Sequence, residues 1–125
     1  MAQQHVLLIE DEPNIAEAIR FILTRAGWRV SLHGDGSDAL ALIRDAAPDV
    51  LILDLMLPGR SGLEILADLR TDSALAALPV LMLTARGQGR DRDAAERAGA
   101  SAFLAKPFAN ADVLDAVRRL AGGQV

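Results

Sequence analysis

Acidic side chains and the chain's one lysine stand at the ends of short apolar runs, a placement that suits phosphoryl chemistry. Glu10 and Asp11 follow the first run, and Asp54 ends a later one. Lys106 follows the last run. Grouped carboxylates suit Mg²⁺, a hard cation that prefers oxygen ligands. A carboxylate can also act as a nucleophile and form an aspartyl-phosphate, while a metal ion and an ammonium group stabilise the transferring phosphoryl group. These residue types therefore predict magnesium-assisted phosphoryl transfer to a carboxylate.

The composition excludes several other kinds of active site. None of the 125 residues is cysteine, which rules out disulfides, zinc–thiolate sites, iron–sulfur clusters and thiol nucleophiles. With two histidines and no tyrosine, few groups remain for imidazole or phenol chemistry, and zinc is a poor candidate. The net charge of −4 and the pI near 5.0 argue against a strongly basic surface, so we expect no direct binding of nucleic acid.

The sequence shows no signal for secretion or membrane insertion. Its first residues lack the basic and apolar regions of a secretory signal peptide. No apolar run approaches the ~18 residues that a membrane span needs. We therefore expect a cytoplasmic protein that does not enter a membrane.

Five short apolar runs have the length and composition of strands that are buried on both faces of a parallel sheet. Segments with helical periodicity separate them. The runs cover residues 5–10, 28–33, 49–54, 79–84 and 101–105. The expected helix limits are a start at Pro13 and a stop at Gly27, a cap at Ser37, a start at Gly62, the range 90–98 and a cap at Asn110. This alternation predicts an α/β fold of flavodoxin-like (βα)5 type, a doubly wound parallel sheet with strand order 2-1-3-4-5.

That strand order would bring the chemically interesting residues together. The carboxyl ends of strands one, three, four and five lie side by side at one edge, where open α/β sheets bind ligands. The residues expected there are Glu10, Asp11, Asp54, Thr84 and Lys106. Each of them alone has a structural explanation, since an acidic residue between a strand and a helix is usually a cap or a turn former. Their coincidence is less easily explained, and three clustered carboxylates repel one another unless a cation lies among them.

The chain resembles the receiver domain of bacterial two-component response regulators, of the chemotaxis-regulator type, over nearly its whole length. The matching segments are residues 8–13, 53–59, 61–62, 83–85 and 106–108. Each segment is a modest signal, but together, in this order and on five strand–helix units, they are strong. We expect one receiver domain over residues 1–121, followed by a flexible tail or the start of a linker at 122–125.

The resemblance implies roles for the residues at the strand ends. Asp54 would accept a phosphoryl group from a sensor histidine kinase or a histidine phosphotransfer protein. Asp11, Asp54 and the backbone carbonyl of Met56 would bind Mg²⁺ directly, and Glu10 would bind it through a water molecule. Mn²⁺ would serve as a substitute. Lys106 would pair with the phosphate.

It also implies residues that respond to the phosphate or surround it. The hydroxyl of Thr84 would swing onto a phosphoryl oxygen, and Ala85 would keep the approach to that oxygen uncrowded. Met56 and Arg86 would flank the phosphate and tune its lifetime. A cis peptide bond would precede Pro107, because X–Pro bonds tolerate the cis form at little cost.

An aromatic residue on the fifth strand couples phosphorylation to the output surface in this family by turning inward, and Phe103 occupies that position. Phe103 lacks the hydroxyl of the commoner tyrosine, and the simpler interpretation is that it belongs to the core. The resemblance implies that the downstream protein target binds the face formed by helix four, strand five and helix five. It also implies a homodimer as a further form, linked to phosphorylation. The protein would be a stand-alone receiver or a receiver cut from a larger regulator.

Two other classes fit the residues less well. A phosphatase of the haloacid-dehalogenase type needs a second aspartate two residues after its nucleophile, where this chain has Met56. A flavin- or nucleotide-binding module needs a glycine-rich loop after the first strand, where residues 10–13 carry acidic side chains that repel phosphates. We therefore expect a signalling protein rather than an enzyme, one that catalyses only its own phosphorylation and slow dephosphorylation.

Overall fold

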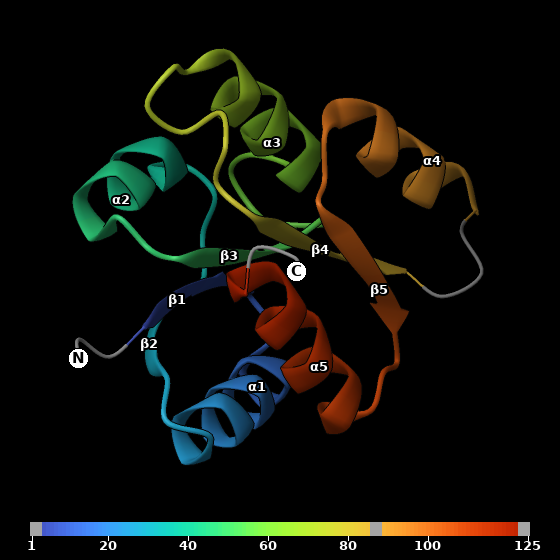
Figure 1. Ribbon diagram of the computed structural model, residues 1–125. Coiled ribbons are helices and arrows are strands. Elements are labelled where there is room, and N and C mark those ends of the chain that lie inside the picture. Colours follow the sequence, from blue (N-terminus) through green and yellow to red (C-terminus); the bar gives the residue numbers. More distant parts are fainter. Residues whose placement is uncertain (1–3, 86–88, 123–125) are drawn as a thin grey trace.

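The computed structural model describes residues 4–85 and 89–122, in which strands and helices alternate along the chain (Figure 1). The strands are β1 (His5–Ile9), β2 (Arg29–His33), β3 (Val50–Asp54), β4 (Val80–Ala85) and β5 (Ala102–Lys106). The helices are α1 (Pro13–Arg25), α2 (Ala39–Ala46), α3 (Gly62–Thr71), α4 (Gly89–Ala98) and α5 (Asn110–Ala121). Each apolar run thus corresponds to a strand, and each strand end either matches the predicted limit or differs from it by one residue.

The strands form one parallel sheet in the order β2-β1-β3-β4-β5. Helices α1 and α5 cover one face, and α2, α3 and α4 cover the other, as Figure 1 shows. The predicted flavodoxin-like α/β fold and its strand order are therefore confirmed. Strand order reverses between β1 and β3, and ligands of such sheets bind outside the carboxyl ends of the strands at this point.

The two strands that flank this reversal are enclosed along their whole length. All five residues of β1 and of β3 are buried, because helices cover both faces of the sheet. Alternate side chains enter opposite layers of the core: Val6 and Leu8 pack with α1 and α5, whereas Leu7 and Ile9 pack with the helices of the other face. Strand β5 lies at the edge of the sheet and is only half-buried along most of its length. The acidic residues therefore follow enclosed strands, and the lysine ends an accessible one.

Local sequence signals explain several helix ends. Pro13 opens α1, and Gly27 follows its end with a φ of 100°, both as predicted. At α3, the Ser61 side chain accepts the Glu64 N–H at 3.2 Å, and the Glu64 side chain accepts the Ser61 N–H at 3.1 Å. This capping box satisfies two backbone donors that the helix itself cannot pair.

No helix within the described ranges has both the length and the apolar character needed to cross a lipid bilayer.

Two predicted caps are wrong. Asp38, not Ser37, occupies the position before α2, and its side chain makes no capping hydrogen bond. The Ser37 N–H instead donates to the Asp35 carboxylate at 2.6 Å. The backbone at residues 35–37 therefore forms a turn that the Asp35 side chain stabilises. Asn110 is the first residue of α5 and does not cap it; extended Ala109 precedes the helix, also without a side-chain cap.

Gly62 lets α3 begin directly against the backbone of β3. Its N–H donates to the Leu55 carbonyl at 2.9 Å. A Cβ at this position would collide with the carbonyl oxygen of Asp54, so any other residue would push the helix away from the strand. The chain therefore leaves Asp54 and returns to it within one fixed loop.

Candidate functional site

The strand ends bring together carboxylates from one loop and one strand. Asp54 is the last residue of β3, and Glu10 and Asp11 follow β1. One carboxylate oxygen from each of these three residues lies within 4.8 Å of the other two. Glu10 and Asp54 are buried, whereas Asp11 is exposed to solvent. The cluster thus has two enclosed members and one open side.

Backbone donors hold the two buried carboxylates in place. The Glu12 N–H donates to Oε2 of Glu10 at 3.0 Å, and the Met56 N–H donates to Oδ1 of Asp54 at 3.2 Å. Both bonds come from the residue two positions later, so each turn that leaves its strand orients its own carboxylate. The side chain of Met56 is 70% exposed and takes no part in this arrangement.

Lys106 reaches the cluster from the end of β5. Its Nζ lies 3.0 Å from Oδ2 of Asp54 and 3.1 Å from Oε1 of Glu10. It also lies 3.3 Å from Oε1 of Glu12, a residue that sequence reasoning did not single out. Glu12 looks like an ordinary acidic helix start in the sequence, and only the position of the lysine reveals the contact.

The charges in this cluster do not balance. Burial raises the pKa of the Glu10 carboxyl to about 7, and the charge of Asp54 adds to that rise, although the Glu12 N–H and Lys106 oppose it. Burial by itself would lower the pKa of Lys106, but its contacts with Asp54 and Glu10 outweigh this and raise that pKa. One ammonium group therefore does not compensate for the buried carboxylates.

A divalent cation fits this donor set. Oε1 of Glu10 is buried and makes no hydrogen bond with any described residue, although the ammonium of Lys106 lies close by. Beside it lie the carboxylates of Asp11 and Asp54, and oxygen ligands of this kind suit Mg²⁺. A cation there would supply the missing positive charge and a partner for the unsatisfied oxygen. The residues present are thus those of a magnesium site.

Thr84 and the last peptide bond of β5 complete the surroundings. Thr84 is buried near the end of β4, and its hydroxyl donates to the Leu104 carbonyl at 3.4 Å, away from the carboxylates. The peptide bond between Lys106 and Pro107 is cis. Arg86 and the side chain of Ala85, which the sequence also singles out, lie outside the described residues.

Phe103 lies near the beginning of β5, before Lys106. It is half-buried against the core that α2, α3 and α4 cover. The guanidinium carbon of Arg92, on α4, lies 4.3 Å from the centroid of its ring. No signal in the sequence points to this contact, because it depends on how α4 is rotated on the sheet.

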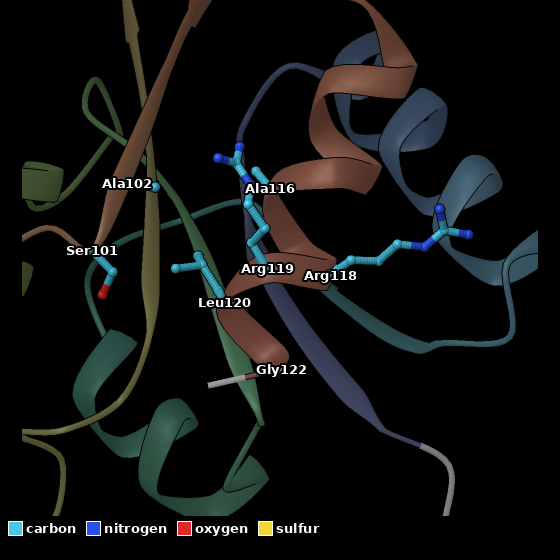
Figure 2. Close-up of a pocket in the computed structure, with 7 residues that line it drawn as sticks. All are labelled: Ser101, Ala102, Ala116, Arg118, Arg119, Leu120 and Gly122. Carbon is cyan, nitrogen blue, oxygen red and sulfur yellow. The ribbon is translucent and has the colours of Figure 1, made fainter. Parts of the chain in front are cut away.

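Of two cavities on the surface, one borders the site and the other does not. One, of about 600 Å³, lies beside the lysine, between residues of α1 and the segment that follows β5. Another, of about 570 Å³, lies between the beginning of β5 and the end of α5, where Leu120 points toward Ser101 and Ala102 and Arg118 points away (Figure 2). No carboxylate lines the second cavity, and the carboxylate cluster lies at the other end of the strands. The chemistry therefore belongs to the first region.

Sequence comparison identifies relatives along most of the chain. A family model described as the response regulator receiver domain matches residues 6–118. The probable transcriptional regulatory protein TcrX of Mycobacterium tuberculosis is 43% identical over 115 residues, which are 92% of this chain and 48% of that protein. The chain spans about half the length of the curated relatives that it matches.

Solved structures agree with this relationship. Chemotaxis response regulator CheY4 of Vibrio cholerae has a TM-score of 0.87 at 30% identity, covering 95% of this chain and 99% of that one. The receiver domain of sensor histidine kinase PA1611 from Pseudomonas aeruginosa has a TM-score of 0.88 at 31% identity, covering 97% of this chain and 99% of that one. That receiver was crystallised with a magnesium ion coordinated in its active site cleft. With this fold, this acidic cluster and a family match over residues 6–118, the chain belongs to the response regulator receiver domains.

Proposed function

We propose that this chain is a phosphorylation-controlled signalling switch in which Asp54 accepts a phosphoryl group. The observation that carries the proposal is the position of Asp54, which is 2% exposed and lies 3.0 Å from Nζ of Lys106, beside two further carboxylates. Histidine kinases phosphorylate receiver domains. The donor here would be the phosphohistidine of a sensor kinase or of a histidine phosphotransfer protein.

In the transfer, an oxygen of Asp54 forms a bond to phosphorus while the bond between phosphorus and the donor's imidazole nitrogen breaks. The leaving nitrogen keeps the electron pair of that bond. Bound Mg²⁺ would neutralise charge on the phosphoryl oxygens, and Mn²⁺ would serve in its place. Asp11, Asp54 and the carbonyl of Met56 would hold the ion, with Glu10 acting through a water molecule.

Two side chains are placed to respond once the phosphoryl group is present. Lys106 would exchange one of its carboxylate contacts for a phosphoryl oxygen, because its ammonium group already lies against Asp54. Thr84 would turn its hydroxyl from the Leu104 carbonyl to the phosphoryl group. Its present hydrogen bond, at 3.4 Å, is long and therefore inexpensive to give up. Ala85 would leave that approach open, and Arg86 would lie beside the phosphate together with Met56.

The response would reach partners through the face formed by α4, β5 and α5. Phe103 lies on this face and is half-buried. The cavity between β5 and α5 in Figure 2 makes the surface of this face concave there. A downstream protein would dock there, or a second phosphorylated copy of the chain in a homodimer. We assign this receiver function to residues 1–121, either alone or within a longer regulator. The chain would catalyse only its own phosphorylation and a slow dephosphorylation.

Incubation with acetyl phosphate and Mg²⁺ tests the proposal directly. The protein should gain the mass of one alkali-labile phosphoryl group, and chelation of the metal should prevent the gain. Asp54→Asn should abolish it. Asp45→Asn, which changes an exposed carboxylate on α2, is the matched control and should be phosphorylated like the unmodified protein. Phosphorylation that survives Asp54→Asn would refute the assignment of Asp54.

A further inference from the structure

An arginine on α4 covers the aromatic ring of β5. The guanidinium carbon of Arg92 lies 4.3 Å from the ring centroid of Phe103, well within the range of an attractive cation–π contact. Arg92 is exposed and Phe103 is half-buried, so the ring lies between the guanidinium on one side and apolar core residues on the other. Among the described side chains Arg92 forms no ion pair, and the ring is its partner.

This contact differs from the other arginine–aromatic pair of the described residues. Arg25 lies 5.5 Å from the ring of Phe21, but both residues belong to α1 and the ring is 59% exposed. That pair joins two turns of one helix and cannot link separate elements. The pair of Arg92 and Phe103 joins α4 to β5, two elements of the proposed output face.

The strand register shows what the ring would approach if it moved inward. Phe103 is paired with Met82, and Ala105 is paired with Thr84. Because side chains two residues apart share a face, Thr84 and Phe103 lie on the same side of the sheet, diagonally across neighbouring strands. A ring that turned toward Thr84 would have to give up the position that it now holds against the guanidinium of Arg92.

We propose that Arg92 is a positioning residue that holds the Phe103 ring in its outer position and so stabilises the unphosphorylated arrangement of α4 and β5. This inference rests on the proposed function of Asp54. Phenylalanine has no hydroxyl with which to hydrogen-bond, so the guanidinium supplies the polar contact that fixes the ring. A ligand that favours the inward ring must break the contact between Arg92 and Phe103 when it binds. Removing this contact beforehand therefore raises the affinity for that ligand.

Equilibrium binding of beryllofluoride, a phosphoryl analogue, in the presence of Mg²⁺ measures this coupling. Arg92→Gln should tighten binding about two- to fivefold, the range expected for a cation–π contact at a partly exposed site. Arg92→Lys keeps a cation and should give an intermediate affinity. In a Phe103→Leu background, Arg92→Gln should change nothing, because the ring that it acts on is gone. Arg97→Gln removes another exposed arginine of α4 and should bind like the unmodified protein.

A spectroscopic measurement separates positioning from a general effect on folding. The ring current of Phe103 should shift the side-chain proton resonances of Arg92, and beryllofluoride should abolish that shift.

An equal gain in affinity from Arg92→Gln with and without the Phe103 ring would overturn the proposal, as would unchanged affinity. If the unmodified protein neither binds beryllofluoride nor is phosphorylated, the proposed function fails instead, so the two failures are distinct.

Discussion

One buried polar residue begins strand β1 and another directly follows the strand, and the two differ in how the charges around them are arranged. At the amino end, His5 is 5% exposed, its Nε2 lies 2.7 Å from the Ser31 hydroxyl, and its N–H donates to Asp49 at 2.7 Å. Just beyond the carboxyl end, Glu10 is 4% exposed and lies among carboxylates and the ammonium of Lys106. Both residues are equally enclosed.

The difference lies in the number of like charges that share the space. Burial lowers the pKa of His5, helped by the charge of Arg29, and thereby favours the neutral ring, whose Nε2 pairs with the Ser31 hydroxyl. Burial raises the pKa of Glu10, the charge of Asp54 adds to that rise, and the carboxylate of Asp11 lies beside both. Burial of a polar group therefore does not mark a functional site in this molecule. Concentration of like charge at one edge of the sheet does.

The largest effect should come from removing the cation of the carboxyl edge. Lys106→Met keeps the apolar stem but leaves two buried carboxylates without the ammonium, so we expect the free energy of unfolding in metal-free buffer to fall by about 1–3 kcal/mol. Saturating Mg²⁺ should recover much of the loss, since Lys106 is not a metal ligand. Urea denaturation with and without MgCl₂ measures both quantities. A loss that Mg²⁺ leaves unchanged would show that the lysine acts by packing.

A smaller effect of opposite sign should follow from removing one carboxylate charge at that edge. Because the pKa of Glu10 is raised to about 7, its contribution to stability is complete below the ordinary value of 4.5 and is lost as the pH rises through 7. Glu10→Gln should therefore stabilise the metal-free protein by about 1–2 kcal/mol at pH 8, with little change at pH 4.5. Calorimetric Mg²⁺ titration should show weaker binding. Destabilisation at pH 8 would contradict this account.

The smallest effect is expected at the amino edge. A lowered pKa means that the contribution of His5 to stability is present above its ordinary value of about 6.5 and is lost as the pH falls through the folded-state value. His5→Gln should remove this part of the pH dependence and leave Mg²⁺ affinity unchanged. The measurement is the difference in unfolding free energy between the two proteins from pH 8 to pH 5. If that difference does not vary with pH, the ring does not titrate as its burial implies.

The fold was predictable because burial on both faces leaves a strong mark on sequence. Residues 50–53 are continuously apolar, as a central strand of a covered parallel sheet must be. Once the strand order follows, Asp54 and Lys106 must approach each other, although they are 52 positions apart. The capping box of Ser61 and Glu64 was also available from the sequence, through its three-residue spacing, but was not predicted.

Features that depend on contacts between distant loops or on helix rotation could not be predicted. Ser37 has the right side chain for a cap, but Asp35 captures its N–H. The backbone next to it is also held, by a bond from the Gly36 N–H to the Pro58 carbonyl at 3.0 Å. The stacking of Arg92 on Phe103 likewise depends on the rotation of α4 about its axis. Periodicity fixes such a rotation poorly in a helix with as little apolar surface as this one.

The presence of a single lysine makes the site chemically addressable. Among 13 lysine and arginine residues only Lys106 carries an amine, and its side chain is 20% exposed. An amine-selective acylating reagent therefore has one side-chain target in these 125 residues, and that target lies against Asp54. The rate of its acylation, followed by mass spectrometry of the peptide that contains Lys106, would report how tightly the ammonium is held. The peptide separates this amine from the α-amino group of the chain, and a metal ion, a phosphoryl group or a partner that changes the rate would each be detected at the site itself.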